Sequence, residues 1–398
     1  MHAVIMVAGK STRTYPLTLT RPKPVLPVLN KPLIYYNLDQ LHGLVDSVVF
    51  IVGYRKEMIE DLIGDEYRGM KIIYQEQTEQ LGTGHAVLQA APHVNDRFIV
   101  MNGDDLFSGE DIKKLVKFPY GALAMPVEDP SQFGIMEIDS NSFLVNFVEK
   151  PKEYISNLVN VGCYIMEPDI FDILSRTPKS ERGEIELPGA ILEASEKNPV
   201  KVIPLNGYWL PTGFPWDLLK TQEYLFSKWK DDGIEGKVEK GAIIEGHAKI
   251  EKNAIVKNGA RIVGPAIIGR NSVVDSNAYI GPNTSIGNNV MIKSQSIIEN
   301  TIILDQSIVD HASIVRHSVV GEGVKIGERS HLISSQSSEG SIKSLVKGKM
   351  IDTSLDQLGA ILADHVVLDA ETKILPGIKI WPGMTTKAVS FVEKDIIE

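Results

Sequence analysis

Short apolar runs alternate with helical patterns of apolar residues along the first 225 residues. The continuous apolar runs, typical of strands buried on both faces, cover residues 3–7, 47–52, 71–75, 97–102 and 121–127. Amphipathic helical patterns fall between them, at residues 31–44, 56–63, 83–91 and 110–118. This alternation predicts an α/β domain with a doubly wound, mostly parallel sheet that binds its ligand at the carboxyl ends of the strands. Residues 132–138 and 143–150 are predicted to form an inserted hairpin.

The period changes to six in the second half of the chain. Aliphatic residues recur at unbroken six-residue spacing, at Ile244, Ile250, Val256, Ile262, Ile268, Val274, Ile280, Ile286, Ile292, Ile298 and Leu304. An alanine precedes each of the first five by two residues, at Ala242, Ala248, Ala254, Ala260 and Ala266. Neither a helix nor a flat strand has this period, whereas a coil of short parallel strands does, each hexad forming one side of a triangular prism. We expect the aliphatic residue to point inward and the alanine to lie near the corner.

The two periods predict the domain organisation. The α/β domain is expected at residues 1–229, a polar linker at 230–240 and the repeat domain at 241–398. The repeat is expected to slip its phase after Leu304. A serine-rich insertion is expected near 333–358, with the coil resuming at 358–380.

Composition narrows the class of protein. A chain of 398 residues is too long for one core, which agrees with two domains. The net charge is −10, and the first 234 residues hold 23 Lys and Arg against 32 Asp and Glu, so affinity for nucleic acid or anionic membranes is not expected. The single cysteine, Cys163, excludes an intrachain disulfide. With no signal peptide and no run of the roughly 20 apolar residues that a membrane helix needs, the protein is expected to be cytoplasmic.

Four cations lie close together after the first predicted strand, although the domain is acidic. Lys10, Arg13, Arg21 and Lys23 share one irregular loop with several prolines and hydroxylated residues. Such a local excess of positive charge favours a specific anionic partner. The structural alternative is a turn between a strand and a helix with solvated cations.

The chemistry of this loop suits phosphate. A Walker-A motif is excluded, because it needs a glycine five residues before Gly9, where Val4 stands. The backbone around Gly9 can instead form a nest for phosphate oxygens. Arg13 can bind a phosphate through two nitrogens, and Lys23 can act as a point charge on a second phosphate. The prolines would hold these cations in place before a ligand arrives.

The loop and the motifs after it resemble the sugar-1-phosphate nucleotidylyltransferases. That family has A-G-x-G-T-R-x-x-P-L-T followed by P-K-P, and this chain has AGKSTRTYPLT and PKP. The resemblance continues in the family's order through EQLGTGHA, NGDDLF, FGIMEID, FVEKP, NVGCYI and GYWLPTGFPWDLL, between residues 79 and 219. It implies a Rossmann-like catalytic domain that transfers UMP or dTMP from UTP or dTTP to a hexose 1-phosphate, glucose or N-acetylglucosamine 1-phosphate, and releases pyrophosphate. The four cations would then surround the triphosphate.

The resemblance also implies the roles of individual residues. Arg13 and Lys23 match catalytic cations, and Asp104 matches the ligand of Mg²⁺, with Asp105 as a competing candidate. Positions that match nucleotide contacts are Ala8, Gly9, Gln77, Gly82 and Thr83. Positions that match contacts to the sugar and its phosphate are Gly134, Glu149, Lys150 and Asn160. Taken one by one, these residues could equally be a polar surface loop, a helix cap or an ordinary hairpin.

Two positions depart from the family pattern. Ser11 replaces a glycine of the first motif. Pro211 stands where many members have an aspartate that is a second magnesium ligand, so one protein ligand suffices or another group such as Asp217 substitutes. The loss of that carboxylate keeps open a second class of function, a regulatory subunit that binds nucleotide sugars without catalysis.

The six-residue repeat resembles the left-handed parallel β-helix found in several members. The layout is most similar to the two-domain enzymes that make UDP-N-acetylglucosamine, in which the β-helix is an acetyltransferase. His311 matches their general base and Lys293 a phosphate-binding lysine. The usual supporting residues are replaced by Ile314, Gly281 and Ser335, so we expect acetyl transfer to be absent. Related β-helices associate around a three-fold axis, which implies a homotrimer or an assembly of trimers.

Overall fold

The computed structural model describes residues 1–131, 133–149, 153–336 and 340–397. Its Cα positions divide the chain into two compact units. The first, here called the sheet unit, comprises Met1–Lys10 and Leu33–Pro211. The second, here called the β-helix unit, comprises Ser11–Pro32 and Thr212–Glu398. The cationic loop therefore packs with the repeat, and the units do not coincide with the ranges expected from sequence.

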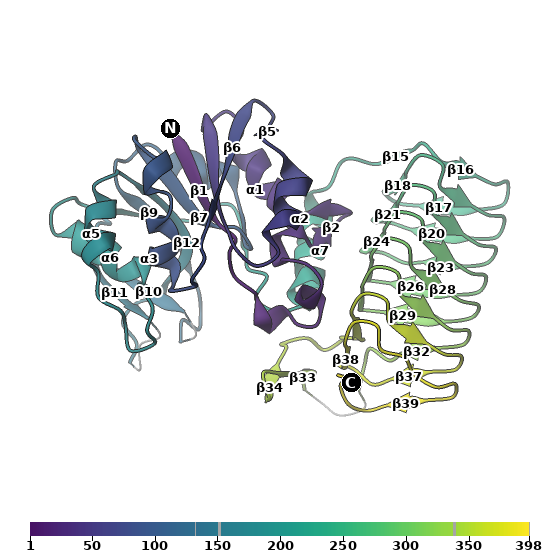
Figure 1. The fold of residues 1–398 in the computed structure, drawn as a ribbon. Coiled ribbons are helices and arrows are strands. Elements are labelled where there is room, and N and C mark those ends of the chain that lie inside the picture. The colour runs from purple at the N-terminus through teal and green to yellow at the C-terminus, as the bar shows by residue number, and fades with distance from the viewer. Residues whose placement is uncertain (132, 150–152, 337–339, 398) are drawn as a thin grey trace. The chain divides into compact units, whose positions relative to one another are not determined.

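A ten-stranded sheet is the centre of the sheet unit (Figure 1). Its strands are β1 (His2–Met6), β4 (Ser47–Val52), β5 (Glu66–Tyr67), β6 (Met70–Glu76), β7 (Phe98–Asn102), β9 (Gly121–Pro126), β10 (Gly134–Ile138), β11 (Leu144–Glu149), β12 (Leu158–Met166) and β13 (Lys201–Pro204). The order is β11-β10-β12-β7-β1-β4-β6-β5, and β9 pairs with both β12 and β13. Strands β7, β1, β4 and β6 run parallel, whereas β12 lies antiparallel to β7. The short strands β8 (Leu106–Phe107) and β14 (Trp209–Leu210) pair separately.

Helices alternate with these strands as the sequence predicts. The helices of the sheet unit are α1 (Leu33–Leu41), α2 (Lys56–Ile63), α3 (Thr83–Leu88), α4 (Gly109–Leu115), α5 (Ile170–Arg176), α6 (Leu187–Ser195) and the 3₁₀ turn η4 (Ala91–His93). Every residue of β4 is buried, as expected for a strand covered on both faces. The predicted α/β fold is thus confirmed, and β10 and β11 form the predicted hairpin. Across the described residues, no helix is both long enough and apolar enough for a bilayer crossing.

Three parallel sheets make up the repeat (Figure 1). The first contains β15 (Gly233–Ile234), β18 (Ala248–Ile250), β21 (Ala266–Ile268), β24 (Thr284–Ile286), β27 (Ile302–Ile303), β30 (Val319–Val320), β35 (Ile361–Leu362) and β38 (Lys379–Ile380). The second contains β16 (Lys237–Val238), β19 (Ile255–Val256), β22 (Val273–Val274), β25 (Met291–Ile292), β28 (Ile308–Val309), β31 (Lys325–Ile326) and β36 (Val367–Leu368). The third contains β17 (Ile243–Glu245), β20 (Arg261–Val263), β23 (Tyr279–Ile280), β26 (Ile297–Glu299), β29 (Ile314–Arg316), β32 (His331–Leu332), β37 (Lys373–Ile374) and β39 (Phe391–Val392). This arrangement is that of the predicted β-helix.

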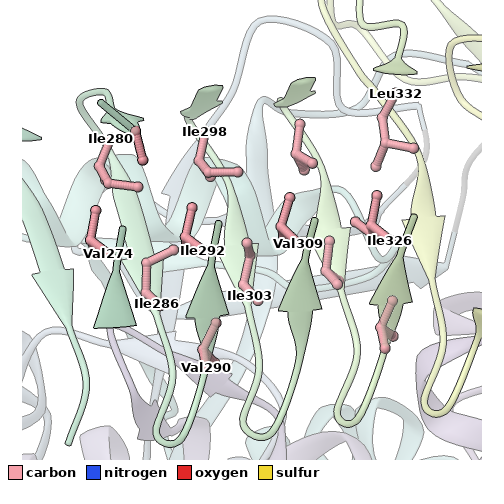
Figure 2. Close-up of a cluster of buried hydrophobic side chains, with 14 of the residues drawn as sticks. Val274, Ile280, Ile286, Val290, Ile292, Ile298, Ile303, Val309, Ile326 and Leu332 are labelled. Atoms are coloured by element: carbon pink, nitrogen blue, oxygen red, sulfur yellow. The ribbon is translucent and has the colours of Figure 1, made fainter. Parts of the chain in front are cut away.

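The register of the sheets follows from the hexads. Ile262 pairs with Ile280, and Ile280 pairs with Ile298, so one turn of the β-helix takes 18 residues, or three hexads. The aliphatic side chains point into the interior (Figure 2), and Ile280 and Ile298 are 0% exposed. Ala254 and Ala260 are buried in the same cluster.

The prediction for Leu304 is wrong. After Ile298 the next inward residue is Ile303, which pairs with Ile286 and belongs to the interior cluster, whereas Leu304 does not. The turn that contains Asn300 is one residue shorter than those before it, because Ile298 pairs with Val315. The phase therefore slips before residue 304 and not after it.

Corner residues in the left-handed conformation recur along the β-helix. Positive φ angles occur at Asn253, Asn271, Asn277, Asn283 and Asn289. Asparagine adopts this conformation more readily than other side chains. The Asn253 amide donates to Asn271 Oδ1 at 3.1 Å, and the Asn271 amide donates to Asn289 Oδ1 at 3.2 Å. One corner is therefore reinforced by a ladder of amides.

The repeat is interrupted once by a segment outside the coil. Strands β33 (Lys343–Val346) and β34 (Lys349–Asp352) form an antiparallel hairpin there. The coil resumes at β35, which pairs with β30.

The cationic loop and one helix complete the β-helix unit. They comprise the 3₁₀ turns η1 (Thr12–Thr14), η2 (Leu17–Leu19) and η3 (Lys23–Val25), the paired strands β2 (Pro27–Val28) and β3 (Lys31–Pro32), and helix α7 (Asp217–Lys228). Gln222 of α7 is 0% exposed; its amide donates to Asn283 O at 2.8 Å and accepts from Ser285 Oγ at 2.5 Å. The Asn30 amide donates to Ile286 O at 2.7 Å. These contacts explain why both segments group with the repeat.

The interior positions should dominate the stability of the β-helix. Ile298→Ala should lower the free energy of unfolding by about 2–5 kcal/mol, because it leaves a cavity in a closely packed core. Ile297→Ala is the matched control: it removes the same atoms from the adjacent residue of β26, which is only partly buried. Urea unfolding followed by circular dichroism measures both variants. Equal losses would contradict the assignment of Ile298 to the interior.

Candidate active site

The glycine turn after β1 is open on its outer side. Ala8 is 4% exposed, and its carbonyl oxygen accepts hydrogen bonds from the Tyr54 N–H at 3.1 Å and the Gln80 amide at 2.9 Å. Gly9 is exposed, and a Cβ atom there would meet no other atom within 4 Å. Packing within the chain therefore does not require a glycine at this position, whereas close approach of a phosphate to the backbone would.

Gln77 and Gly82 are brought together by one side chain. Gln77 follows β6 and is 5% exposed. Its Nε2 lies 2.9 Å from His85 Nδ1 and 3.4 Å from the carbonyl oxygen of Gly82. Gly82 has a φ of +101°, and a Cβ atom there would lie 2.7 Å from Ile185 O. Only glycine fits this conformation and this close approach of the two segments.

Thr83 and Asn160 line the same cavity, which has a volume of about 260 Å³. The Thr83 hydroxyl accepts a hydrogen bond from the Leu187 N–H at 3.2 Å. The Asn160 side-chain oxygen accepts from the Gly162 N–H at 3.0 Å and from the Tyr164 hydroxyl at 2.8 Å. A predicted nucleotide contact and a predicted sugar contact thus lie in one cavity of the sheet unit.

Three charged residues of this cavity were missed by the sequence analysis. Arg182, Glu184 and Glu186 line it, and Arg182 Nη2 lies 3.0 Å from Glu186 Oε1. Burial raises the pKa of Glu186, but hydrogen bonds from Ser180 and Arg182 outweigh it and hold that pKa below its ordinary value. In the sequence, these residues are marked only by the charged pattern RGEIE before α6. Backbone hydrogen bonds between distant segments bring this pattern to the cavity, such as that from the Ile185 N–H to Leu81 O at 2.7 Å.

Asp104 and Asp105 occupy different environments in the turn after β7. Asp104 is partly exposed. Asp105 is 8% exposed, and its Oδ2 accepts a hydrogen bond from Trp209 Nε1 at 3.3 Å. Its backbone oxygen also accepts from the buried Asn37 amide at 2.7 Å. Asp105 is therefore tied into the structure, and Asp104 is the more accessible carboxylate.

The hairpin holds the remaining predicted sugar contacts. Gly134 begins β10 and pairs in register with Glu149 at the end of β11. Lys150 lies outside the described residues. Gly134 and Glu149 are thus neighbours on the two paired strands of the hairpin.

Arg13 and Lys23 belong to the β-helix unit, whereas Gln77, Gly82 and Asp104 belong to the sheet unit. The Arg13 guanidinium is exposed and lies over the Phe214 ring, 5.7 Å from its centroid. Lys23 is 3% exposed.

Asp217, the first residue of α7, lies near both cations. It accepts a hydrogen bond from the Phe214 N–H at 2.8 Å. Burial raises the pKa of the Asp217 carboxyl, and the positive charges of Lys23 and Arg13 oppose part of that rise. The hydrogen bond from the Phe214 N–H and the charge of Lys220 oppose that rise more strongly than the two loop cations do.

The backbone conformation of Ser11 explains why the family has a glycine at this position. Its φ of 47° and ψ of 51° place it in the left-handed region, which favours glycine. The Ser11 carbonyl oxygen accepts bonds from the Thr14 N–H at 2.9 Å and the Thr18 hydroxyl at 3.0 Å. These bonds stabilise the turn despite the side chain.

The interpretation that all four cations surround a triphosphate is wrong for Arg21. Its Nη2 donates to Asp364 Oδ2 at 2.6 Å and to Glu322 Oε2 at 2.9 Å. The sequence cannot distinguish a cation that binds phosphate from one that binds a carboxylate 343 residues later.

Among the residues considered for the metal from the sequence, Asp104 is the accessible carboxylate. Pro211 is exposed and has no ligand atom in its side chain, and Asp217 is engaged as described above. Within the described ranges, no three His, Cys, Asp or Glu side chains gather into a site that could hold a metal. A single carboxylate such as Asp104 suits a metal whose other ligands are phosphate oxygens and water.

His311 lies on the surface of the β-helix. It is half exposed, its Nδ1 is 2.8 Å from Ser294 Oγ, and its Nε2 is 3.7 Å from Asp310 Oδ1. A Cβ atom at Gly281 would lie 2.5 Å from Glu299 Cγ, so the space for a larger residue is filled.

Comparison with known proteins identifies the family. The sequence profile described as Nucleotidyl transferase matches residues 2–228, more than half of the chain. The chain belongs to the nucleotidyl transferase family. A second profile, described as GMPPB C-terminal domain, matches residues 262–397.

Relatives of this nucleotidyl transferase match both of its parts. The bifunctional protein GlmU of Methanocaldococcus jannaschii is 36% identical over 396 residues, covering 100% of this chain and 96% of the relative. A bifunctional sugar-1-phosphate nucleotidylyltransferase/acetyltransferase of Sulfurisphaera tokodaii is 34% identical over 390 residues, covering 96% of this chain and 94% of the relative. The crystal structure of a UDP-glucose pyrophosphorylase complexed with UDP-glucose is similar with a TM-score of 0.53 and 25% identity, covering 57% of this chain and 99% of that one. The predicted family is confirmed.

Substitution at Gly82 tests the packing of the cavity. Gly82→Ala should lose about 1–3 kcal/mol more stability than Gly43→Ala, because its Cβ atom would overlap Ile185. Gly43 is a matched control, since its φ is also positive, at +78°, but its Cβ atom would meet nothing within 4 Å. Thermal unfolding measures both variants. Similar losses would show that the close approach of the two segments is not required.

Proposed function

We propose that this nucleotidyl transferase moves UMP or dTMP from UTP or dTTP to a hexose 1-phosphate, glucose or N-acetylglucosamine 1-phosphate, and releases pyrophosphate. The observation that carries the proposal is the cavity that Thr83 and Asn160 share, because it joins a predicted nucleotide contact to a predicted sugar contact. The name of the Sulfurisphaera relative, which includes sugar-1-phosphate nucleotidylyltransferase, supports it. Uridine and thymidine nucleotides remain alternatives.

Recognition of the pyrimidine is assigned to Gln77 and Gly82. The hydrogen bonds of the Gln77 side chain to His85 and Gly82 use its Nε2, which orients the amide. An amide held in this way can pair its oxygen with the imide N–H of uracil or thymine. The backbone of Gly82 would supply the second contact.

The reaction itself needs alignment and charge neutralisation. An oxygen of the sugar 1-phosphate attacks the α-phosphorus, a new P–O bond forms, and the bond to pyrophosphate breaks. Arg13 and Lys23 would hold the phosphate oxygens, and the backbone around Ala8 and Gly9 would cradle them. Lys23 is almost fully buried, and the surrounding atoms restrict the rotamers that its side chain can adopt.

Asp104 would hold the divalent metal, which we propose is Mg²⁺. Its partial exposure supports this choice over Asp105, whose carboxylate is bonded to Trp209. When bound, the metal would neutralise negative charge on the phosphates. Gly134, Glu149 and Asn160 are assigned to the sugar, and Lys150 to its phosphate. Arg182, which pairs with Glu186, lines the cavity that contains Asn160.

The direct test is pyrophosphate release. The protein is incubated with Mg²⁺, each nucleoside triphosphate in turn and a panel of sugar 1-phosphates. UTP or dTTP with a hexose 1-phosphate should release pyrophosphate. Binding of nucleotide without release for any combination would favour the regulatory subunit and would mark Pro211 as a lost metal site.

Variants of the loop and of the metal ligand refine this test. Arg13→Ala should lower kcat/KM by about 10²–10³, the effect of losing one group that stabilises charge in the transition state. Arg270→Ala is the control; that residue is 71% exposed on the β-helix, and turnover should stay within about twofold. Unchanged turnover in Arg13→Ala would contradict the role of the loop.

Asp104→Asn should nearly abolish turnover while nucleotide still binds.

We also propose that the protein is a cytoplasmic homotrimer, or an assembly of trimers, formed through the β-helix. The exposed side chains of Ile243, Met291 and Phe391 lie on the third and second sheets of the β-helix and supply apolar surface for such an interface. Light scattering of the intact protein measures the assembly.

Acetyl transfer is the second candidate activity, because the names of both relatives include the word bifunctional. His311 has the exposure that a general base needs, but the residues expected to support it are replaced. We therefore expect no release of free thiol from acetyl-CoA with glucosamine 1-phosphate or galactosamine 1-phosphate. Robust release that disappears in His311→Ala would contradict this and make the protein bifunctional.

A further inference from the structure

A buried ion pair fastens the cationic loop to the β-helix. Arg21 Nη2 lies 2.6 Å from Asp364 Oδ2 and 2.9 Å from Glu322 Oε2. The side chains of Arg21 and Asp364 are only 13% and 5% exposed. Salt screens such a pair much less than a pair on the surface, and removal of one partner leaves an uncompensated charge.

The Asp364 carboxylate is prepared to receive the loop. Its Oδ1 accepts the Glu322 N–H at 2.8 Å, which orients the group from within the β-helix. Its Oδ2 accepts both the Arg21 guanidinium and, at 2.6 Å, the hydroxyl of Thr20. Two consecutive loop residues therefore share one oxygen whose position the β-helix determines.

This contact restricts the residues that are assigned to phosphate. Pro22 separates Arg21 from Lys23 and has a fixed φ of −69°, so holding Arg21 also restricts Lys23. Farther along the loop, the Asn30 amide donates to Ile286 O at 2.7 Å. The segment from Thr20 to Asn30 is thus attached to the β-helix near both of its ends.

We propose that Arg21 and Asp364 are positioning residues for nucleotidyl transfer, so that the β-helix is part of the phosphate-binding apparatus and not a separate module. The inference rests on the proposed function, because it takes the loop to bind the triphosphate. The β-helix acts here by holding Lys23, two residues after Arg21, in the geometry that the phosphates require. Neither Arg21 nor Asp364 touches the substrate.

The kinetic test uses Asp364→Asn, which keeps the size of the side chain and an oxygen for Thr20 but removes the negative charge. We expect kcat/KM for the nucleotide to fall roughly 10- to 100-fold, the scale of a misplaced catalytic group. The KM for the sugar 1-phosphate should change by less than about twofold. Arg21→Lys should recover part of the activity that Arg21→Met loses, and the double variant Arg21→Met with Asp364→Asn should be little worse than either single variant.

Glu371→Gln is the matched control. Glu371 lies on the same β-helix and pairs with Arg329 at 2.8 Å, but its side chain is 43% exposed and that of Arg329 is 61% exposed. Its loss should leave kcat/KM within about twofold of the unmodified protein. A fall as large as that of Asp364→Asn would overturn the proposal, because any lost ion pair of the β-helix would then have the same effect.

Hydrogen–deuterium exchange gives a readout that does not depend on turnover. In Asp364→Asn, amides in residues 16–30 should exchange faster without substrate, while those of the β-helix interior keep their protection. Unchanged exchange of the loop would overturn the proposal, as would faster exchange along the whole β-helix, which indicates a general loss of stability. If the unmodified protein releases no pyrophosphate, the proposed function fails, whereas the exchange result still decides whether Asp364 holds the loop.

Discussion

The buried pairing of Arg21 with Asp364 determines where the cationic loop can lie. Removing two charges from water is unfavourable unless they pair closely and their remaining hydrogen bonds are satisfied. The Asp364 carboxylate meets this condition through Thr20 and the Glu322 N–H. If Arg21 moved elsewhere, the carboxylates of Asp364 and Glu322 would both lose their ion pair with it. The β-helix therefore determines the position of the residues that follow Arg21, Lys23 among them.

The β-helix can hold the cationic loop in a fixed position because its hydrophobic interior is continuous. Inward aliphatic side chains such as Ile280 and Ile298 stack from turn to turn (Figure 2) and exclude water along the axis. Each strand between the two ends of a sheet pairs with the strands of the preceding and following turns, so a displacement of one turn would disturb its neighbours. A carboxylate mounted on such a structure loses little freedom when a ligand binds. Helix α7, attached through Gln222, gains the same support and carries Asp217 close to the cations.

Much of the fold could be predicted because its determinants are local or periodic. Strands β1 and β4 are apolar runs, and the six-residue spacing allows only a coil of short strands. The prediction failed at Leu304, where one turn lacks a residue near Asn300 and the hydrophobic pattern continues by coincidence for one more hexad. Glycine at 82 was expected from its motif, but its physical reason, the approach of Ile185, appears only in three dimensions. The same is true of Glu184 and Glu186, which reach the cavity through backbone bonds between distant segments.

The sequence interpretation that Arg21 surrounds a triphosphate failed for a different reason. A guanidinium binds carboxylate and phosphate with the same geometry, so its residue type does not identify its partner. The most direct test of the central claim is a crystal structure of the full chain with UTP or dTTP and Mg²⁺. The expected result has Arg13 and Lys23 on the phosphate oxygens while the Arg21 guanidinium remains on Asp364. A structure in which Arg21 leaves Asp364 and binds the triphosphate would contradict the claim that the β-helix holds the loop.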